Sequence, residues 1–418
     1  MNLLYSDRSY QRDKKGKVLK VRGVVKMAKT LRQTHDGTVR ELENVTDPDE
    51  QLEAKTGTRY GAAELGFRHY WYPALLSRQL GEKPKSVTLL GEKLVFIRGN
   101  GRPYALFDRC AHRGMPLSEG KCWTEGTLTC AYHGWTYRLG DGELMAALTD
   151  GPESAVVGKK GKGVRSYPVE ERNGVIYVYM GDDKPPPLEE DVPEELLKPE
   201  YVFEAVTSVW NSNWRPAVEN GYDAAHATYV HRYSLRWRTQ FNLPPAWAGK
   251  VESEVQGKYL IQRRRGPFGF EANYPGFGLW PRHAWLRKAL AKVRQKFGPK
   301  RKPMIAGVRL PCIIVNHYTY YSHIRYSIPI DANHTRNFQM LAGKYHGLKA
   351  LAFRLQYWLW HRWVFHKWFN EGQDKWIVEH LDYSAPEMFF RPDASLVQLR
   401  RYFENTARTS DPVDGMKA

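Results

Sequence analysis

Two short segments of the chain each combine one cysteine with one histidine. Cys110 and His112 form the first pair, and Cys130 and His133 form the second. Structural zinc sites usually place cysteine with cysteine and histidine with histidine, so the order here argues against a zinc ribbon. The mixed order suits a [2Fe-2S] cluster in which one iron takes both thiolates and the other takes both imidazoles. The pattern therefore predicts transfer of single electrons.

The residues beside these ligands favour the same interpretation. Gly114 and Gly134 follow the two histidines and permit the tight turns that aim backbone N–H groups at the cluster sulfurs. The segments resemble the ligand loops of the Rieske family. Met115 and Tyr132 stand where the cytochrome bc-type members have a further disulfide. The resemblance is thus to the lower-potential centres of ferredoxins and oxygenases.

A second set of ligand-type residues lies at Asp223, His226 and His231. Two histidines with one carboxylate make the open, three-ligand iron site of non-haem oxygenases. Asp223 and His226 share a helix face, so the carboxylate could accept a hydrogen bond from the imidazole N–H that is not bound to metal. His226 and His231 lie roughly 140° apart on a regular helix. An irregular turn over residues 227–230 is therefore expected, because otherwise the two imidazoles could not meet at one ion.

Longer stretches extend the resemblance to one group of enzymes. The stretches 70–73, 167–170 and 213–223 resemble the terminal oxygenase (alpha) component of Rieske non-haem iron ring-hydroxylating oxygenases. They are most similar to the branch with carbazole dioxygenase and oxoquinoline monooxygenase. Residues 369–376 resemble the family helix that supplies the third iron ligand, which implies Asp374 as the partner of His226 and His231. Glu219, Glu371 and Glu379 are the competing carboxylates.

The resemblance implies an α+β fold. It comprises a Rieske antiparallel β-sandwich and a helix-grip (START-like) catalytic domain with an antiparallel sheet and C-terminal helices. We expect an N-terminal extension over residues 1–63, a Rieske domain over 64–183 and a catalytic domain over 184–418. The residues themselves predict strands at 86–90, 94–98, 259–262 and 312–315 and a long helix over 348–369.

Cofactors, partners and reaction follow from the same resemblance. The expected cofactors are the [2Fe-2S] Rieske cluster and a mononuclear Fe(II). Electrons would come from NAD(P)H through a reductase, a ferredoxin or both, and would be used with O2. In the head-to-tail homotrimer of this branch, Asp223 would bridge His226 to His133 of the partner subunit. The expected substrate is a bulky hydrophobic aromatic or polycyclic compound, including terpenoids and steroids. Monooxygenation, dioxygenation, O-demethylation and pure electron transfer remain open.

The composition of the chain limits where the protein can act and what it can bind. The 418 residues carry a net charge of +18 and four cysteines, and we expect no signal peptide, no transmembrane segment and a cytoplasmic location. Residues 272–330 contain no Asp or Glu. We expect no nucleic-acid binding, because no recognition motif accompanies this charge. A docking surface for an acidic electron donor is one alternative, and a solvated basic face is the other. The amphipathic pattern over 285–297 indicates a surface helix or one that lies on a membrane.

Overall fold

The computed structural model describes residues 11–12, 18–19, 58–223, 225–226, 230–231, 250–265 and 305–408. The chain divides into two compact units, Met1–Lys55 with Ser384–Glu387 and Thr56–Tyr383 with Met388–Ala418. In the first unit, β1 (Gln11–Arg12) pairs antiparallel with β2 (Val18–Leu19). The elements described below all belong to the second unit.

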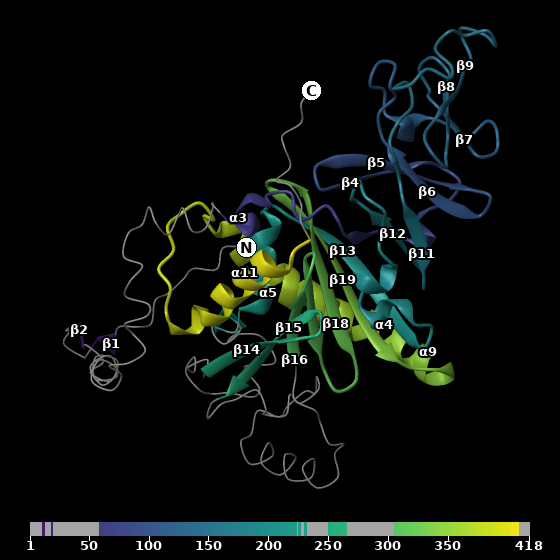
Figure 1. Ribbon diagram of the computed structural model, residues 1–418. Coiled ribbons are helices and arrows are strands. Elements are labelled where there is room, and N and C mark those ends of the chain that lie inside the picture. Colours follow the sequence, from purple (N-terminus) through teal and green to yellow (C-terminus); the bar gives the residue numbers. More distant parts are fainter. Residues whose placement is uncertain are drawn as a thin grey trace. The chain divides into compact units, whose positions relative to one another are not determined.

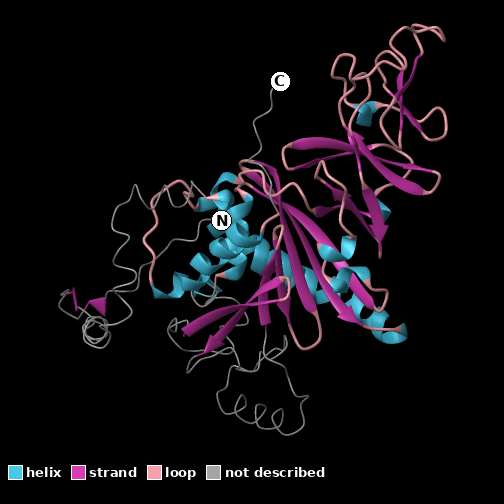
Figure 2. Ribbon diagram, viewed as in Figure 1, coloured by secondary structure: helices cyan, strands magenta, loops and turns pink. Residues whose placement is uncertain are grey.

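Three small antiparallel sheets form the first part of the second unit (Figures 1 and 2). The β4–β5 and β5–β6 turns each pair a left-handed residue with a glycine, at Leu90–Gly91 and Asn100–Gly101, which is the geometry of tight hairpins. In spatial order the sheets contain β10 (Ser166–Tyr167), β6 (Arg102–Phe107), β5 (Glu92–Gly99) and β4 (Lys85–Leu89); β11 (Val169–Arg172), β12 (Val175–Tyr179) and β3 (Trp71–Leu76); and β7 (Thr127–Thr129), β8 (Trp135–Arg138) and β9 (Leu144–Ala147).

A seven-stranded antiparallel sheet forms the second part (Figure 2). Its long inner strands alternate apolar and polar side chains, and both kinds are buried on β18 and β19. A strand that is buried on both faces needs cover on both sides, so the polar side chains must face another layer of the protein. In spatial order the strands are β13 (Tyr201–Trp210), β19 (His334–Lys344), β18 (Ser322–Asp331), β17 (Ile313–His317), β16 (Ile305–Arg309), β15 (Tyr259–Arg265) and β14 (Lys250–Gln256).

Helices supply that layer. The longest runs without a break from α9 (Gly347–Gln356) through the π-helix η5 (Tyr357–Asp374) to α10 (Lys375–His380). This is the helix expected over 348–369. The other helices are α3 (Arg59–Ala62), α4 (Glu194–Leu197), α5 (Trp214–Tyr222) and α11 (Ala394–Thr406), with short 3-10 turns η1 (Ser77–Gln79), η2 (Leu117–Glu119), η3 (Leu188–Glu190) and η6 (Arg391–Asp393).

One hydrophobic core joins the small sheets to the large one. It contains Tyr72 and Tyr177 from the small sheets together with Trp214 and Ile314 from the second part. The N–H of Leu90, in the β4–β5 turn, also donates to the carbonyl of Pro329 at the end of β18 over 2.8 Å. The expected boundary near residue 183 therefore lies inside a continuous core and stays a prediction.

The expected fold class is confirmed as α+β. Within the described ranges, no helix has both the length and the hydropathy needed to cross a bilayer. The amphipathic segment expected over residues 285–297 lies outside the described residues.

Candidate iron centres

The two loops that carry the predicted cluster ligands repeat one hydrogen-bond pattern. Each cysteine N–H donates to the carbonyl five residues later, from Cys110 to Met115 and from Cys130 to Trp135, both at 2.8 Å. Each cysteine carbonyl accepts from the glycine four residues later, over 2.9 Å from Gly114 and 3.2 Å from Gly134. Both glycines are left-handed, with φ of +73° and +67°. Two equivalent tight turns thus present their side chains to the same space.

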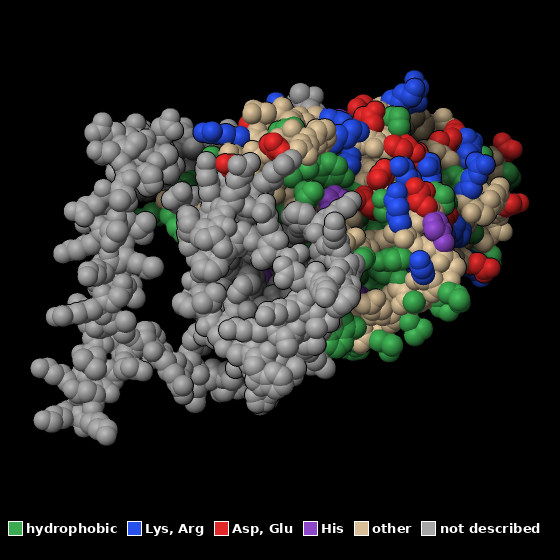
Figure 3. Space-filling view, turned by 90° about the horizontal axis from the view of Figure 1, so that it is seen from below, with side chains coloured by type: hydrophobic (Ala, Val, Ile, Leu, Met, Phe, Trp, Pro, Cys, Tyr) green, Lys and Arg blue, Asp and Glu red, His purple; other side chains and the backbone are tan. Residues whose placement is uncertain are grey.

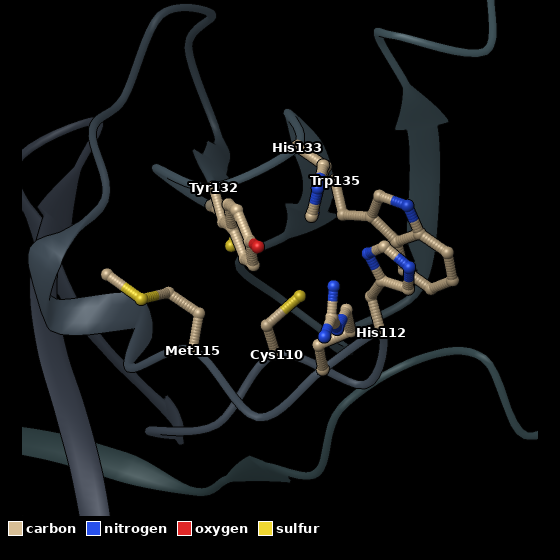
Figure 4. Close-up of a pocket in the computed structure, with 8 residues that line it drawn as sticks. Cys110, His112, Met115, Tyr132, His133 and Trp135 are labelled. Carbon is tan, nitrogen blue, oxygen red and sulfur yellow. The ribbon is translucent and has the colours of Figure 1, made fainter.

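That space is a shallow hollow between the two loops (Figure 4). Both cysteines are buried, whereas His112 is exposed and His133 is half-buried. The two imidazole rings lie 4.7 Å apart, and His112 stacks on the indole of Trp135 at 4.9 Å. The thiolate ligands therefore lie on the inner side of the hollow and the imidazoles on its solvent side.

Tyr137 is a residue of this site that the sequence analysis missed. Its hydroxyl lies 3.1 Å from Sγ of Cys110 and also accepts a hydrogen bond from the N–H of Ala111 over 3.1 Å. Hydrogen bonds to cluster sulfurs are one way in which a protein sets the reduction potential of an iron-sulfur centre. The available signal was its position on β8, directly after the second ligand loop.

The helix α5 carries Asp223 at its carboxyl end. Asn213 caps the amino end, where its side chain accepts from the N–H of Arg215 over 3.1 Å. The buried carboxylate of Glu219 fixes the middle of the helix, because it accepts from Tyr60, Tyr383 and Arg400 at 2.8–3.2 Å. Buried charges of this kind are costly unless paired, so these contacts hold α5 in one position.

Asp223 ends α5 and starts the next turn. Its Oδ1 accepts from the N–H of Ala225 over 2.7 Å, and its Oδ2 accepts from the N–H of His226 over 3.1 Å. The same Oδ2 lies 3.5 Å from Nδ1 of the His226 ring, a distance at which the attraction is mainly electrostatic. The carboxylate thus orients both the backbone and the ring of His226.

The structure brings together His226, His231 and Asp374, although Asp374 is far from the two histidines in the sequence. Oδ1 of Asp374 lies 3.5 Å from Nε2 of His226 and 3.3 Å from Nε2 of His231. One ligand atom from each residue falls within 4.8 Å of the others. Asp374 is the last residue of η5, and wide π turns of this kind are frequent at functional sites. The irregular turn expected over 227–230 falls largely outside the described residues.

The protonation states of the residues around the predicted mononuclear site depend on one another. Burial lowers the pKa of His226, but the carboxylates of Asp223 and Asp374 outweigh burial and raise that pKa to about 9. Burial raises the pKa of Asp374, but His231, His226 and Arg325 outweigh it, so the net shift is downward. An ionised carboxylate beside basic imidazoles is a strong ligand set for a divalent cation, which must displace the imidazole protons.

Two further residues support this centre and were missed by the sequence analysis. Nδ1 of His231 lies 2.6 Å from Oε1 of Gln373, so the ring donates there and presents Nε2 to Asp374. Arg325 is buried on β18, donates to the carbonyl of Ala217 over 2.6 Å and adds positive charge near Asp374. Gln373 adjoins a predicted ligand, but nothing in the sequence distinguished Arg325.

The competing carboxylates have other partners. Glu219 accepts the hydrogen bonds from Tyr60, Tyr383 and Arg400 described above. Glu371 accepts from the indole N–H of Trp210 over 3.1 Å, and Glu379 accepts from the N–H of Asn211 over 2.7 Å. Among the described residues, Asp374 is the carboxylate that faces both histidines.

These residues fit the two iron centres chemically. Oδ1 of Asp374, which makes no hydrogen bond among the described residues, and two imidazoles leave room for further ligands on a ferrous ion. The loop hollow offers two thiolates inside and two imidazoles outside, as a Rieske cluster requires. The particular ligand assignments stay predictions.

Comparison with known proteins agrees with both centres. Residues 70–168 match the family model for the Rieske [2Fe-2S] domain, and residues 179–410 match that for the homotrimeric ring hydroxylases. The terminal oxygenase component of carbazole 1,9a-dioxygenase from Metapseudomonas resinovorans is 44% identical over 178 residues, which are 42% of this chain and 45% of that protein. The vanillate O-demethylase oxygenase subunit of a Pseudomonas strain is 31% identical over 218 residues, which are 51% of this chain and 58% of that protein. The chain spans less than half the length of the carbazole relative in this alignment.

Solved structures cover more of the chain. The terminal oxygenase of carbazole 1,9a-dioxygenase from Nocardioides aromaticivorans IC177 superposes with a TM-score of 0.70 at 29% identity, over 85% of this chain and 99% of that one. The oxygenase in the reduced complex between oxygenase and ferredoxin of carbazole 1,9a-dioxygenase gives a TM-score of 0.69 at 28% identity, over 87% and 96%. Since the catalytic-domain match covers more than half of the chain and follows a Rieske domain, this protein belongs to the family of homotrimeric ring hydroxylases.

Proposed function

We propose that the chain is the terminal oxygenase of a multicomponent Rieske oxygenase, which hydroxylates a bulky hydrophobic ring compound with O2. One observation carries the proposal: His226, His231 and Asp374 converge within the same chain that holds the Rieske loops. A protein that only passed electrons would need no open three-ligand site in addition to its cluster. The mononuclear iron, when bound, supplies the O2-activating chemistry.

The residues of the chain supply positioning and charge. His226, His231 and Asp374 would hold the ion by three ligands and leave the remaining positions to O2, water and substrate. Gln373 would keep the His231 ring in the tautomer that presents Nε2. Arg325 would offset the negative charge of Asp374 in the buried interior.

Asp223 is proposed to carry the electron route between subunits. Its contacts with the ring and N–H of His226 support a bridge at the edge of the mononuclear site. In a head-to-tail homotrimer, the same carboxylate would accept a hydrogen bond from His133 of the partner subunit. Nδ1 of His133 is buried and has no hydrogen-bond partner among the described residues. This supports Nε2 as the ring nitrogen that would point outward to the neighbouring subunit.

The donor, location and domain division complete the proposal. Electrons would pass from NAD(P)H through a reductase and a ferredoxin to the exposed His112 edge of the cluster. The ferredoxin complex of the carbazole system supports this choice of donor. A cytoplasmic location is supported by the few cysteines, two of which are cluster ligands in this scheme. Residues 64–183 would form the Rieske domain and 184–418 the catalytic domain.

The reaction would be tested by reconstitution. The purified chain, a carbazole-system ferredoxin and reductase, and NADH would be supplied with polycyclic aromatic, diterpenoid and steroid compounds under ¹⁸O2. We expect labelled product from the complete system and none from the His226→Ala variant. NADH consumption without labelled product from any compound, at the same rate in both proteins, would contradict the proposal.

O-demethylation is the second candidate, and the similarity to the vanillate O-demethylase oxygenase subunit favours it. The same panel with aryl methyl ethers separates the two reactions. Release of formaldehyde together with an unlabelled phenol would support demethylation, whereas a product with one labelled hydroxyl on the ring, or with two on adjacent ring carbons, would support ring hydroxylation.

A further inference from the structure

The long helix that ends near Asp374 exposes a row of large hydrophobic side chains on its outer side. We call this row the outer face, and it consists of Leu348, Leu351, Leu355, Trp358, Leu359 and Trp363. Apart from the adjacent Trp358 and Leu359, successive members are three or four residues apart, which places them on one side of the helix. Leu348 is 85% exposed, Leu359 73% and Trp363 57%. A contiguous apolar row of this size on a soluble surface marks a site of interaction.

The opposite side of the same helix accounts for its attachment to the domain. Phe353 and Tyr357 are buried and form a cluster with Leu341 of β19. Phe365 and Val378 continue the buried side farther along. The helix therefore already has its core contacts, and the outer face is additional to what the fold requires. Figure 3 views the molecule from the lower side of Figure 1 and shows hydrophobic side chains projecting from its edge.

The charged residues on the helix segment that carries the outer face are all positive, and one of them, Arg354, lies 3.4 Å from the buried carboxylate of Glu204 on β13. No Asp or Glu occurs from residue 332 to residue 370, and Lys349, Arg354, Arg362 and Lys367 fall within the helix. The Arg362 guanidinium lies 4.6 Å from the ring centre of Trp358 and 5.5 Å from that of Trp363. Its aliphatic stem can thus cover apolar surface while the charge stays at the polar edge.

From this combination we infer that the outer face lies on the surface of an anionic lipid bilayer. Leucine and tryptophan would enter the interface between headgroups and acyl chains, and the cations would pair with lipid phosphates. A second copy of the chain carries the same net charge of +18 and offers these cations less complementary charge than an anionic bilayer does, which favours the lipid. The helix is not apolar enough to span the bilayer, which fits a helix that lies along it.

Binding would be measured with the full-length protein and no substrate, so the result is independent of the proposed function. The probes are sedimentable vesicles of phosphatidylglycerol with phosphatidylcholine, and of phosphatidylcholine alone. We expect the partition coefficient on the anionic vesicles at low salt to be at least about tenfold higher than on the neutral ones, and to fall as salt is added.

Two variants assign binding to the outer face. Leu351→Gln, Leu355→Gln and Leu359→Gln together keep good helix formers and remove the apolar row, and Lys349→Glu with Lys367→Glu reverses two charges. Each should lower anionic partition by about tenfold or more. The matched controls alter exposed residues elsewhere and should bind like the natural protein: Val255→Thr, Ile305→Thr and Met388→Gln for the first, and Lys159→Glu with Lys160→Glu for the second.

Three results would overturn the inference. The first is absence of binding to anionic vesicles at low salt. The second is equal binding by the triple glutamine variant and the natural protein. The third is a lower oligomeric mass of the triple glutamine variant in sedimentation equilibrium without lipid, because the outer face would then be a contact between copies of the chain.

Discussion

Nε2 of His231 lies 3.3 Å from Oδ1 of Asp374, and no hydrogen bond is made by that oxygen within the described parts of the chain. A buried carboxylate oxygen without a donor is costly, whereas the same atom bound to a cation is stable. This pair of residues therefore marks the place where the mononuclear ion would be held.

Asp374→Ala should remove the mononuclear iron, because the one carboxylate that faces both histidines is lost. Iron analysis should fall from about three to about two per chain, the two being those of the cluster. Glu371→Gln is the matched control, since Glu371 lies three residues away and binds Trp210 instead. Retention of iron by Asp374→Ala together with its loss from Glu371→Gln would move the ligand role to Glu371.

His226→Ala should also lose the mononuclear iron and keep the visible spectrum of the Rieske cluster. The cluster loops have their own core, which contains Leu117, Leu128 and Tyr137 and excludes the catalytic histidines. The two centres should thus be lost independently. Bleaching of the cluster spectrum in this variant would mean that they share a structural requirement.

Gln373→Ala should weaken iron binding without abolishing it. The ring of His231 would lose the acceptor at 2.6 Å that fixes its tautomer, and losses of such outer partners typically cost about 10- to 100-fold in metal affinity. Iron retention during dialysis against a chelator would measure this. Gln356→Ala, at an exposed position of α9, should retain iron like the natural protein.

Asp223→Asn should leave both metals bound and slow turnover strongly. Asparagine keeps one oxygen that can accept from the N–H of Ala225, but it replaces the oxygen that accepts from the N–H of His226 and removes the charge that pairs with the His226 ring. Single-turnover reaction of the prereduced variant would separate slow electron transfer from lost metal. Asp182→Asn, an exposed carboxylate paired with Arg165, is the control. Turnover at the natural rate would exclude Asp223 from the electron route.

Tyr137→Phe should lower the reduction potential of the Rieske cluster, because the hydroxyl that contacts Sγ of Cys110 stabilises added negative charge. A spectroscopic redox titration would measure the shift. Tyr104→Phe, in the same core but without a contact to a cluster ligand, should leave the potential unchanged. An unchanged potential in Tyr137→Phe would show that this hydroxyl has no influence on the cluster.

The sequence predicted those features that depend on local patterns. Cys110, His112, Cys130 and His133 were recognised because ligand loops keep fixed spacings. The long helix over 348–369 was predicted from its periodicity, although its π geometry was not. The family resemblance supplied Asp374, since no local spacing relates it to His226.

Other features depend on tertiary contacts and could not be predicted. Arg325 sits on an inner strand, where a charged side chain is unusual, and its role follows from its proximity to Asp374. Glu219 was a candidate ligand by type, but its partners Tyr60 and Arg400 come from distant parts of the chain. The exposure of the outer face could not be predicted, because it depends on which side of the helix packs on the sheet.

The carboxylate of Glu219 ties the helix before His226 to Arg400, close to the end of the chain. All predicted cluster ligands and their core lie between residues 95 and 164. During synthesis on the ribosome, the parts that surround the cluster emerge long before Asp374 and Arg400. The segments that would hold the sulfur-bridged irons are therefore available for folding before those that would hold the single ion.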